Sequence, residues 1–220
     1  MKITKYPQSC ILIETDNKRI LIDPGTLKFK QEFLEDWKDI DIILITHKHA
    51  DHCYAEAINK IIENKKAKLY ATKEVADYCQ DIKPEIVKEG YIFNLGDIKI
   101  EVVHAVHGYL PHFSKEGKEI NENIGYIISD GSIKAYATSD TIGFKNNYKC
   151  DVLLTPLSNH GITLGIWDGA LFAKETGAKI IIPLHYDNPA HLLNREEAIE
   201  EFQKDNLNLK FLDIKESIKI

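Results

Sequence analysis

The chain has 220 residues, of which 44% are hydrophobic, and its formal net charge is −6 with histidine counted as neutral. This length and apolar content suffice for one sizeable core, so we predict a single domain over residues 1–220. The acidic balance lacks the electrostatic footprint of nucleic-acid binding or of docking to an anionic membrane, and we expect neither partner. No apolar run reaches transmembrane length and the N-terminal segment has no signal-peptide pattern, so we expect a cytoplasmic protein.

Four cysteines are scattered along the chain without Cys-x-x-Cys spacing: Cys10, Cys53, Cys79 and Cys150. Because no secretion signal is recognised, they are predicted to be reduced thiols of the core, not a disulfide set or a zinc ribbon. Cys53 directly follows a histidine of interest, and a role there stands beside its interpretation as a small hydrophobic residue packed inward.

The hydrophobic pattern of the first half predicts strands interleaved with helices. Strands are expected at 10–15 and 18–23, joined by a turn at Asp16–Asn17, and at 41–46, 68–71, 91–94 and 98–106. Helices are expected near 31–38, 54–64 and 73–79.

The second half repeats this order of strands followed by helices. Strands are expected near 123–129 and 132–138, with Asp130–Gly131 as the hairpin signal, and then at 150–156, 179–184 and 209–214. Trp167–Thr176 is a predicted helix that Gly177 can close, and Asn194 can cap a helix through Asp205 with Glu197 placed for a capping box. The pattern predicts an α/β fold: a four-layered αββα sandwich of two facing mixed sheets with helices outside both.

The segment His47–His52 reads His-Lys-His-Ala-Asp-His and directly follows an apolar run, Ile42–Ile45. The run is typical of a buried strand, so the polar residues lie on the loop that leaves its carboxyl end, where open α/β sheets place their sites. Imidazole and carboxylate suit Zn²⁺, Mn²⁺ or Fe²⁺, and this segment offers more donors than one tetrahedral ion uses. The alternative is a polar loop that happens to hold three histidines.

Four further landmarks accompany this motif. A hairpin, Ile11–Gly25, ends at Asp-Pro-Gly; Val102–Gly108 carries histidines at a strand end; Ile133–Thr141 delivers one Asp; and Lys179–Tyr186 delivers one His. Together with Thr-His-x-His-x-Asp-His, they occur in the order used by the metallo-β-lactamase superfamily, which the chain resembles from about Cys10 to its last helix. The resemblance implies the αββα fold and metal-dependent hydrolysis.

The resemblance also implies a ligand set and one or two divalent ions, with Zn²⁺ expected and Mn²⁺ or Fe²⁺ as alternatives. One ion is assigned to His47, His49 and His107, the second to Asp51, His52 and His185, and Asp140 is assigned as the bridge between them. Asp23 is expected to be structural or to accept the second N–H of a ligand histidine. A metal-bound hydroxide is expected to attack a small ester, lactone, thioester or phosphodiester, with Asp51 orienting the nucleophile and no covalent intermediate.

Several histidines allow more than one interpretation. His104 precedes His107 by three residues, and on a strand the two face opposite sides. We favour His107 as the ligand because it ends the strand and abuts Gly108, where the backbone can turn. His160 follows a strand whose end should face the metals, so it can donate a proton to a leaving group, or it is an ordinary surface histidine. His191 is expected at the rim.

The segment Gly108–Asn121 has the composition of a mobile flap over the cleft. The chain length, Pro183–Tyr186 and Gly161–Leu164 resemble the branch of small metal-dependent hydrolases that includes the ascorbate-6-phosphate lactonases, although that branch more often has Thr-Met at 163–164. We expect a small-molecule substrate, and a homo-oligomer is compatible with the sequence. Two other classes stay open: a single-iron dioxygenase acting on a persulfide, and a non-catalytic metal-binding module of the same fold, against which the full ligand set argues.

Overall fold

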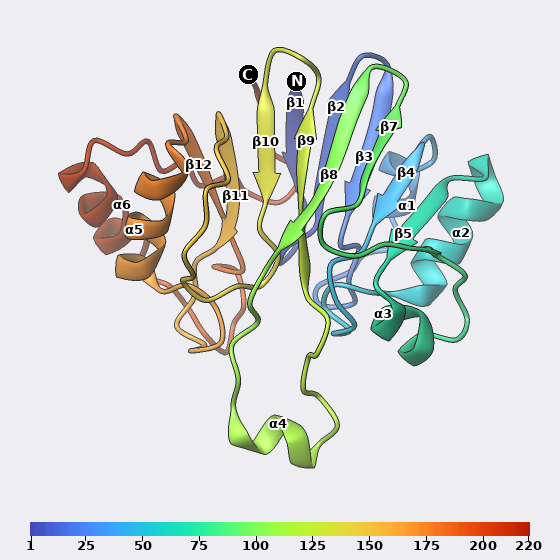
Figure 1. The fold of residues 1–220 in the computed structure, drawn as a ribbon, viewed down its shortest axis with the longest axis horizontal. Helices are drawn as coiled ribbons and strands as arrows, with labels where there is room; N and C mark the ends of the chain where they lie inside the picture. Colours follow the sequence, from blue (N-terminus) through green and yellow to red (C-terminus); the bar gives the residue numbers. More distant parts are fainter.

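The computed structural model describes residues 1–220, apart from the side chain of Lys65. Two mixed β-sheets stand face to face in the middle of the molecule, and helices cover the outer side of each (Figure 1). The two chain ends lie close together at one edge of the sheets, opposite the edge from which α4 projects (Figure 1).

The first sheet has the strand order β13-β1-β2-β3-β4-β5-β6. Its strands are β1 (Lys2–Lys5), β2 (Ile11–Thr15), β3 (Lys18–Ile22), β4 (Ile42–Leu44), β5 (Lys68–Ala71), β6 (Glu85–Ile86) and β13 (Ser217–Lys219). Strands β3 to β6 run parallel to one another, whereas β13, β1, β2 and β3 pair antiparallel. The helices in this half are α1 (Phe33–Asp36), α2 (Ala55–Lys65) and α3 (Lys73–Tyr78).

The second sheet has the strand order β12-β11-β10-β9-β8-β7. Its strands are β7 (Ile92–Leu95), β8 (Ile98–His104), β9 (Ile124–Ser129), β10 (Lys134–Ala137), β11 (Val152–Pro156) and β12 (Ile180–Leu184). Strands β10, β11 and β12 are parallel. Helices α5 (Ile166–Thr176) and α6 (Arg195–Lys204) cover this sheet, and the short helix α4 (Pro111–Lys115) lies in the projecting segment between β8 and β9 (Figure 1).

Three hydrophobic clusters fill the three interfaces between these four layers. Because side chains alternate across a strand, a strand that is apolar throughout can bury both faces. In β4, Ile42 and Leu44 pack into the cluster between the sheets, whereas Ile43 packs into the cluster that includes α1 to α3 residues. In β11, Leu154 faces the central cluster and Leu153 the cluster around α5 and α6. The predicted αββα sandwich is therefore confirmed.

Both predicted hairpins are present, with different loops. Asp16 and Asn17 adopt positive φ of 48° and 58°, the left-handed pair that suits a two-residue hairpin turn. The Asp130 loop is longer than predicted, since Ser129 pairs with Lys134 and four residues lie between. The Asp130 carboxylate accepts hydrogen bonds from the backbone N–H groups of residues 132 and 133, which stabilises this wider loop.

The predicted strand at 209–214 is wrong. Only Leu209 makes a bridge there, to Ile181 of β12, and the chain then turns away. It has to cross from the second sheet to the edge of the first, where β13 pairs with β1. The sequence analysis also does not predict the short elements β1, β6, α4 and β13.

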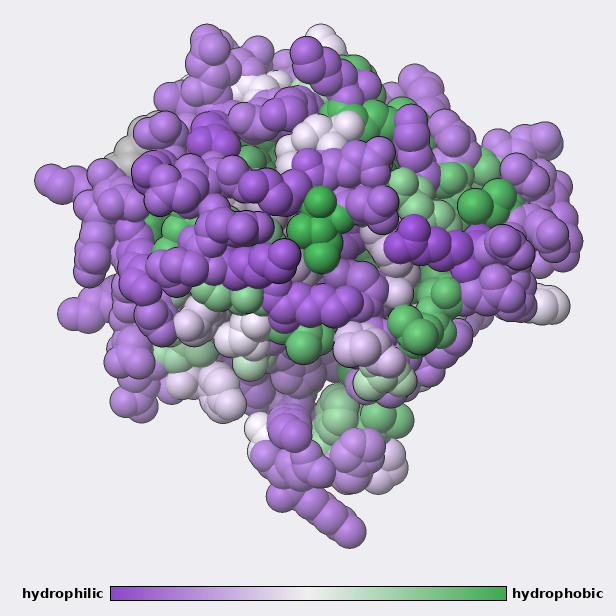
Figure 2. Space-filling model, turned by 180° about the vertical axis from the view of Figure 1, so that it is seen from behind, coloured by the Kyte–Doolittle hydropathy of each residue, from purple (hydrophilic) through white to green (hydrophobic). Residues whose placement is uncertain are grey.

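The face of the molecule shown in Figure 2, seen from behind the view of Figure 1, is largely hydrophilic, with scattered hydrophobic residues. Large apolar side chains that are exposed include Trp167 and Leu171 on α5. Among the described residues, no helix has the length and apolar character needed to cross a membrane.

The strands that precede the candidate site all end at the same edge of the sandwich. Parallel strands present their carboxyl ends together, so the loops after β3 and β4 meet those after β10 and β12 across the central layer. Two of these loops touch directly: Thr26 donates to the carbonyl of Ala50 at 2.8 Å, and Tyr54 donates to that of Pro24 at 2.9 Å.

Gly25 makes this close approach possible. A Cβ atom at position 25 would lie 1.8 Å from the carbonyl oxygen of Asp51, which no side chain can tolerate. We therefore predict that Gly25→Ala displaces the 47–52 loop and destabilises the fold by about 1–3 kcal/mol, as overpacking does. Urea unfolding and metal titration would measure both effects. Gly143→Ala is the matched control because its nearest neighbour would be 3.9 Å away. Equal stability and equal metal affinity in the two variants would contradict this account.

Candidate metal centre

The loop after β4 folds into a tight turn that gathers its histidines. The backbone N–H groups of His52 and Cys53 both donate to the carbonyl of His49, at 2.9 and 3.0 Å. His47 and His52 are fully buried, and their ring centroids lie 4.0 Å apart. The loop therefore presents these two histidines to the interior of the sandwich, whereas His49 and Asp51 are partly exposed.

A first group of donors consists of His47, His49 and His107. Each offers a ring nitrogen, and the three nitrogens lie within 4.8 Å of one another. Nε2 of His47 is 3.2 Å from Nδ1 of His49. The backbone bends His107 toward them at Gly108, where a Cβ atom would lie 2.5 Å from the Ile162 backbone.

The hydrogen bonds around this group determine which nitrogen of each ring carries the proton. Nδ1 of His107 donates to the Gly108 carbonyl at 2.7 Å, and Nε2 of His49 donates to the Lys118 carbonyl at 2.8 Å. The opposite nitrogen of each ring therefore carries a free lone pair. Nε2 of His107 is buried and has no hydrogen-bond partner.

The tautomer of His47 follows from its neighbours. Its Nδ1 lies 3.0 Å from the Thr46 hydroxyl and 3.3 Å from the Ser139 hydroxyl. Thr46 gives its proton to Asp23 at 2.7 Å, and Ser139 gives its proton to Asn123 at 2.7 Å. Since each hydroxyl has one proton, both act as acceptors toward His47, whose Nδ1 is protonated and whose Nε2 lone pair is free.

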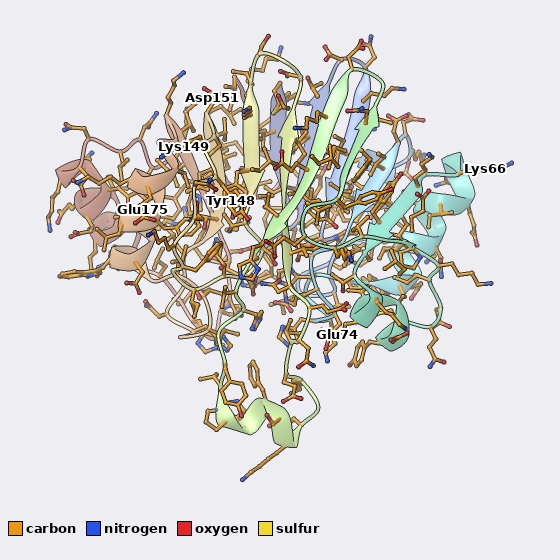
Figure 3. All side chains as sticks on the ribbon, viewed as in Figure 1. Lys66, Glu74, Tyr148, Lys149, Asp151 and Glu175 are labelled. Atoms are coloured by element: carbon orange, nitrogen blue, oxygen red, sulfur yellow. The ribbon has the colours of Figure 1, made fainter. Side chains whose placement is uncertain are left out.

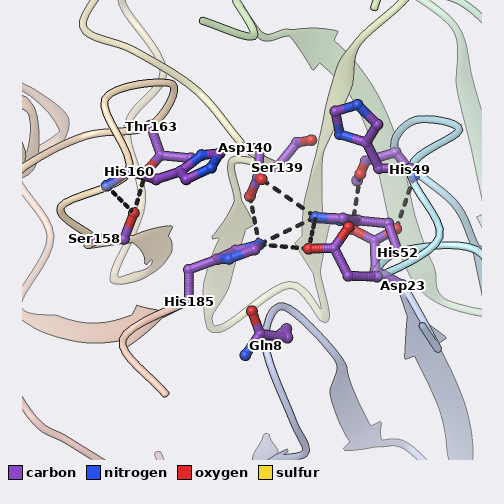
Figure 4. Close-up of polar contacts among 12 residues, drawn as sticks. Gln8, Asp23, His49, His52, Ser139, Asp140, Ser158, His160, Thr163 and His185 are labelled. Carbon is purple, nitrogen blue, oxygen red and sulfur yellow. Dashed lines mark hydrogen bonds and ion pairs between the residues drawn. The ribbon is translucent and has the colours of Figure 1, made fainter. Parts of the chain in front are cut away.

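A second group consists of Asp51, His52 and His185, again with donor atoms within 4.8 Å of one another. Nδ1 of His52 donates to Asp23 at 2.8 Å, which leaves the Nε2 lone pair free. That atom lies 3.1 Å from Nε2 of His185 (Figure 4). Asp51 Oδ2 is 4.0 Å from the same nitrogen of His52 and 3.8 Å from that of His185.

Asp140 lies between the two groups. Its carboxylate oxygens are 3.3 Å from Nε2 of His52 and 3.0 Å from Nε2 of His185 (Figure 4). It also forms a third overlapping group with His47 and His52. A carboxylate at this place can contact a cation bound by the first group or one bound by the second.

These residues fit one or two divalent ions. Free lone pairs of His47, His49, His52 and His107 converge with two carboxylates, which is the donor chemistry that Zn²⁺, Mn²⁺ and Fe²⁺ accept. Neutral rings with converging lone pairs repel one another at such distances, so the arrangement calls for a cation between them.

The histidine pKa values of the first group agree with metal binding. Burial lowers the pKa of His47 well below its usual value, lowers that of His49, and lowers that of His107 to about 4. These rings are therefore neutral near pH 7, the state in which they can bind a metal ion.

In the second group the histidine pKa values shift in the opposite direction. Burial works to lower the pKa of His52 and His185, but neighbouring carboxylates outweigh it, Asp140 and Asp23 for His52 and Asp140 and Asp51 for His185, and both values are raised. For Asp140 itself, burial favours the neutral form, yet the two histidines hold its pKa well below the usual range. Without an ion, protons would thus take the positions beside Asp140, and a metal ion would compete with them.

Backbone strain accumulates at these positions. Asp23, Ser139 and His185 have positive φ of 49°, 67° and 61°, a region that residues other than glycine seldom occupy. Ser139 precedes Asp140, so two strand ends that deliver donors are strained. Such conformations persist where the surrounding structure imposes them, and they are typical of functional sites.

A cavity of about 380 Å³ opens beside the donors. It is lined by Asp51, Asp140 and His185 from the centre and by His160 and Phe113, whose ring centroids lie 6.3 Å apart. The His160 ring also contacts that of His191, with centroids 3.9 Å apart. His104 lies outside the centre, half exposed and 3.1 Å from Glu89.

The segment between β8 and β9 covers one side of the cavity. Phe113 packs edge-on against His49, with ring centroids 5.9 Å apart, and Lys118 accepts the hydrogen bond from His49 already described. At its far end, Glu74 of α3, which is labelled in Figure 3, accepts hydrogen bonds from the backbone N–H groups of Asn121 and Glu122, at 3.1 and 2.9 Å.

Glu74 also pairs with a lysine of the cavity wall. Lys48 donates to its carboxylate at 2.8 Å. Glu74 carries no signal in the local sequence, because its partners lie 26 to 48 residues away and no pattern connects them. Ser139 and Lys118 likewise carry no such signal, since their roles depend on contacts to His47 and His49.

Comparison with known proteins gives a consistent result. A family model described as a beta-lactamase superfamily domain matches residues 2–185. A UPF0173 metal-dependent hydrolase of Thermococcus onnurineus is 32% identical over 184 residues, 78% of each chain. Another, of Pyrococcus horikoshii, is 28% identical over 214 residues, 93% of each chain. Among solved structures, the metallo hydrolase Igni18 of Ignicoccus hospitalis has a TM-score of 0.81 and 23% identity, covering 99% of this chain and 97% of its own, which shows a shared fold.

Metal content tests the first group. The purified protein should bind one to two divalent ions per chain, and His49→Ala should lower that number because it removes a converging lone pair. Elemental analysis after reconstitution would measure it. His104→Ala is the matched control, since this histidine lies on the surface away from the donors. Protein that takes up no transition metal at all would refute the site.

Asp140 tests the relation between the two groups. Asp140→Asn keeps the shape but removes the charge at the point where both groups meet, so binding of the second ion should weaken most. We expect the loss of activity to exceed the loss of stability, because the residue ends a strand at a loop. Calorimetric metal titration beside thermal unfolding would compare them. Asp168→Asn is a control on an exposed side chain; if Asp140→Asn behaves like it, the bridging assignment is wrong.

Proposed function

Because this chain belongs to the beta-lactamase superfamily and, within it, to the UPF0173 metal-dependent hydrolases, we propose that it hydrolyses a small ester, lactone, thioester or phosphodiester. We propose Zn²⁺ as its ion, with Mn²⁺ and Fe²⁺ as alternatives, and one or two ions per chain. We further propose that residues 1–220 act as one domain in the cytoplasm.

The observation that carries this proposal is the overlap of three donor groups at the wall of one cavity. In our assignment His47, His49 and His107 would hold one ion, Asp51, His52 and His185 would hold the other, and Asp140 would be shared between them. When bound, such ions supply a water molecule of lowered pKa and polarise an oxygen atom of the substrate.

Residues of the chain can orient the attacking water and keep bulk water away from the reacting atoms. Asp51 is partly exposed at the cavity and lies near His52 and His185, so its carboxylate can accept a hydrogen bond from the attacking water and direct it. Tyr78, Phe113 and Ile162 line the cavity with apolar surface, which excludes bulk water from the reacting atoms.

The charge of the cavity narrows the substrate class. Among the described lining residues, the only acids are Asp51 and Asp140, both of which we assign to the ions. Lys48 and Lys118 also line the cavity, each paired with a glutamate outside it, Glu74 and Glu116. A cationic substrate is therefore disfavoured, and a neutral or anionic molecule with an apolar part is favoured. A cavity of about 380 Å³ suits a small molecule rather than a polymer chain.

We assign His160 to the leaving group. It lines the cavity, and burial together with His191 lowers its pKa below the usual value. As a general acid it must be protonated, so its contribution should be largest at mildly acidic pH and fall as pH rises through that pKa.

Turnover with defined substrates tests the function. Metal-free protein should be inactive on bis-p-nitrophenyl phosphate and on simple lactones and thioesters, and added Zn²⁺ or Mn²⁺ should restore hydrolysis of at least one class. Oxygen uptake with a persulfide substrate would instead indicate the single-iron dioxygenase. Metal binding without any turnover would favour the non-catalytic module.

The pH dependence separates the role of His160 from that of the metal centre. With p-nitrophenyl substrates the rate should rise with pH and level off, because that leaving group departs without a proton. With poor leaving groups the rate should also fall at higher pH, and His160→Ala should remove this fall and slow them by about 100-fold or more. Pre-steady-state and steady-state rates across pH 5–9 would measure this.

Metal content of the His160→Ala protein is the accompanying control, and it should match that of the unaltered chain. An equal loss for good and poor leaving groups would overturn the general-acid role and indicate substrate positioning. Loss of metal together with activity would make His160 a ligand.

A further inference from the structure

Two cysteines lie in contact beside the candidate metal centre. Cys53 directly follows His52, and Cys79 ends helix α3; their Sγ atoms are 3.4 Å apart. Cys53 is 5% exposed and Cys79 is half-buried, so one thiol is sheltered and the other reaches solvent. All four cysteines are free thiols in the structure, and Cys10 and Cys150 are both buried.

The contact makes the two thiols unequal in position. The S–H group of Cys53 donates to Sγ of Cys79. Cys79 is the sulfur that an oxidant in solvent reaches first, and Cys53 lies sheltered beside it, which is the arrangement of an attacking and a resolving cysteine.

We propose that Cys53 and Cys79 form a reversible oxidation site whose substrate is a hydroperoxide. The Cys79 thiolate attacks the O–O bond, is oxidised to a sulfenic acid and releases hydroxide or an alkoxide. The Cys53 thiol then loses its proton and attacks Sγ of Cys79, forming the S–S bond and releasing water. Overall, two thiols and one hydroperoxide give one disulfide, water and an alcohol or a second water.

The surroundings allow the sulfur atoms to approach. A disulfide requires about 2.05 Å between them, so they must move together by roughly 1.4 Å. Cys79 ends a helix of six residues, and most residues of 80–85 are exposed. Movement of this end disturbs little packing, whereas Cys53 is held by its backbone bond to His49.

Oxidation of the two cysteines would also affect the cavity, because they lie beside its wall. A disulfide would fix the end of α3, with Tyr78 of the cavity wall, to the loop that carries His52. The same helix begins near Glu74, which holds Lys48 and the segment between β8 and β9. The proposed site does not depend on the hydrolytic function, since it is defined by the thiols alone.

Thiol chemistry on the full-length folded chain tests this proposal. Treatment with a small excess of hydrogen peroxide, followed by alkylation and peptide mass spectrometry, should lower the thiol count from four to two. A linked peptide containing Cys53 and Cys79 should appear, the intact mass should fall by about 2 Da, and dithiothreitol should reverse both changes.

Two variants sharpen the test. Cys79→Ser alters a half-buried position, should remain folded by circular dichroism, and should leave Cys53 reduced under the same treatment. Cys150→Ser removes a thiol outside the pair and should still give the Cys53–Cys79 link. Oxidation of Cys79 to a sulfinic acid without a link, a disulfide between chains, a different pairing, or no reaction of Cys79 before Cys10 and Cys150 would each overturn the proposal.

Discussion

The buried carboxylate of Asp23 joins the parts of the structure on which the candidate site depends. It accepts hydrogen bonds from the backbone N–H and hydroxyl of Thr46 and from Nδ1 of His52, at 2.7 to 2.8 Å. The first two bonds attach the end of β3 to the loop after β4. The third determines the tautomer of His52, and through the Thr46 hydroxyl the same carboxylate also determines that of His47. One charge, 1% exposed, thus orients two rings so that their Nε2 atoms face the centre.

Bringing these donor atoms together destabilises the fold, and apolar packing between the layers offsets this cost. Converging lone pairs repel, and Asp23, Ser139 and His185 occupy unfavourable backbone conformations at a cost of order 1–3 kcal/mol each. Each strand that ends at the site is anchored by apolar side chains, on both faces in the case of β4 and β11. Hydrophobic burial of this extent exceeds the strain, so the donors are held at fixed positions. Binding of a cation then removes much of the repulsion, which couples metal affinity to stability.

Much of this arrangement is encoded in local sequence patterns. Apolar runs such as Ile42–Ile45 predict strands buried on both faces, and polar residues directly after them predict where side chains meet. The choice of His107 over His104 follows from strand parity and from Gly108. Patterns fail where an element is short or its partner is distant. β1 carries one strongly apolar residue and depends on pairing with β2 and β13, and the contact between Cys53 and Cys79 spans 26 residues without any periodic signal.

The residues proposed to bind metal and the residues that shape the substrate cavity come from different parts of the fold. The proposed ligands come from strand ends and adjoining loops, where the core fixes geometry. The facing wall, with Phe113 and Lys118, comes from the segment between β8 and β9, which projects from the body and is held by a few polar contacts to Glu74 and His49 (Figure 1). Substitutions in that segment alter cavity shape and charge without disturbing the core. Because the Lys118 carbonyl also accepts a hydrogen bond from His49, however, its position affects the orientation of that ring. A substrate that moves this segment would therefore act on His49 through this hydrogen bond and through the Phe113 ring packed against it.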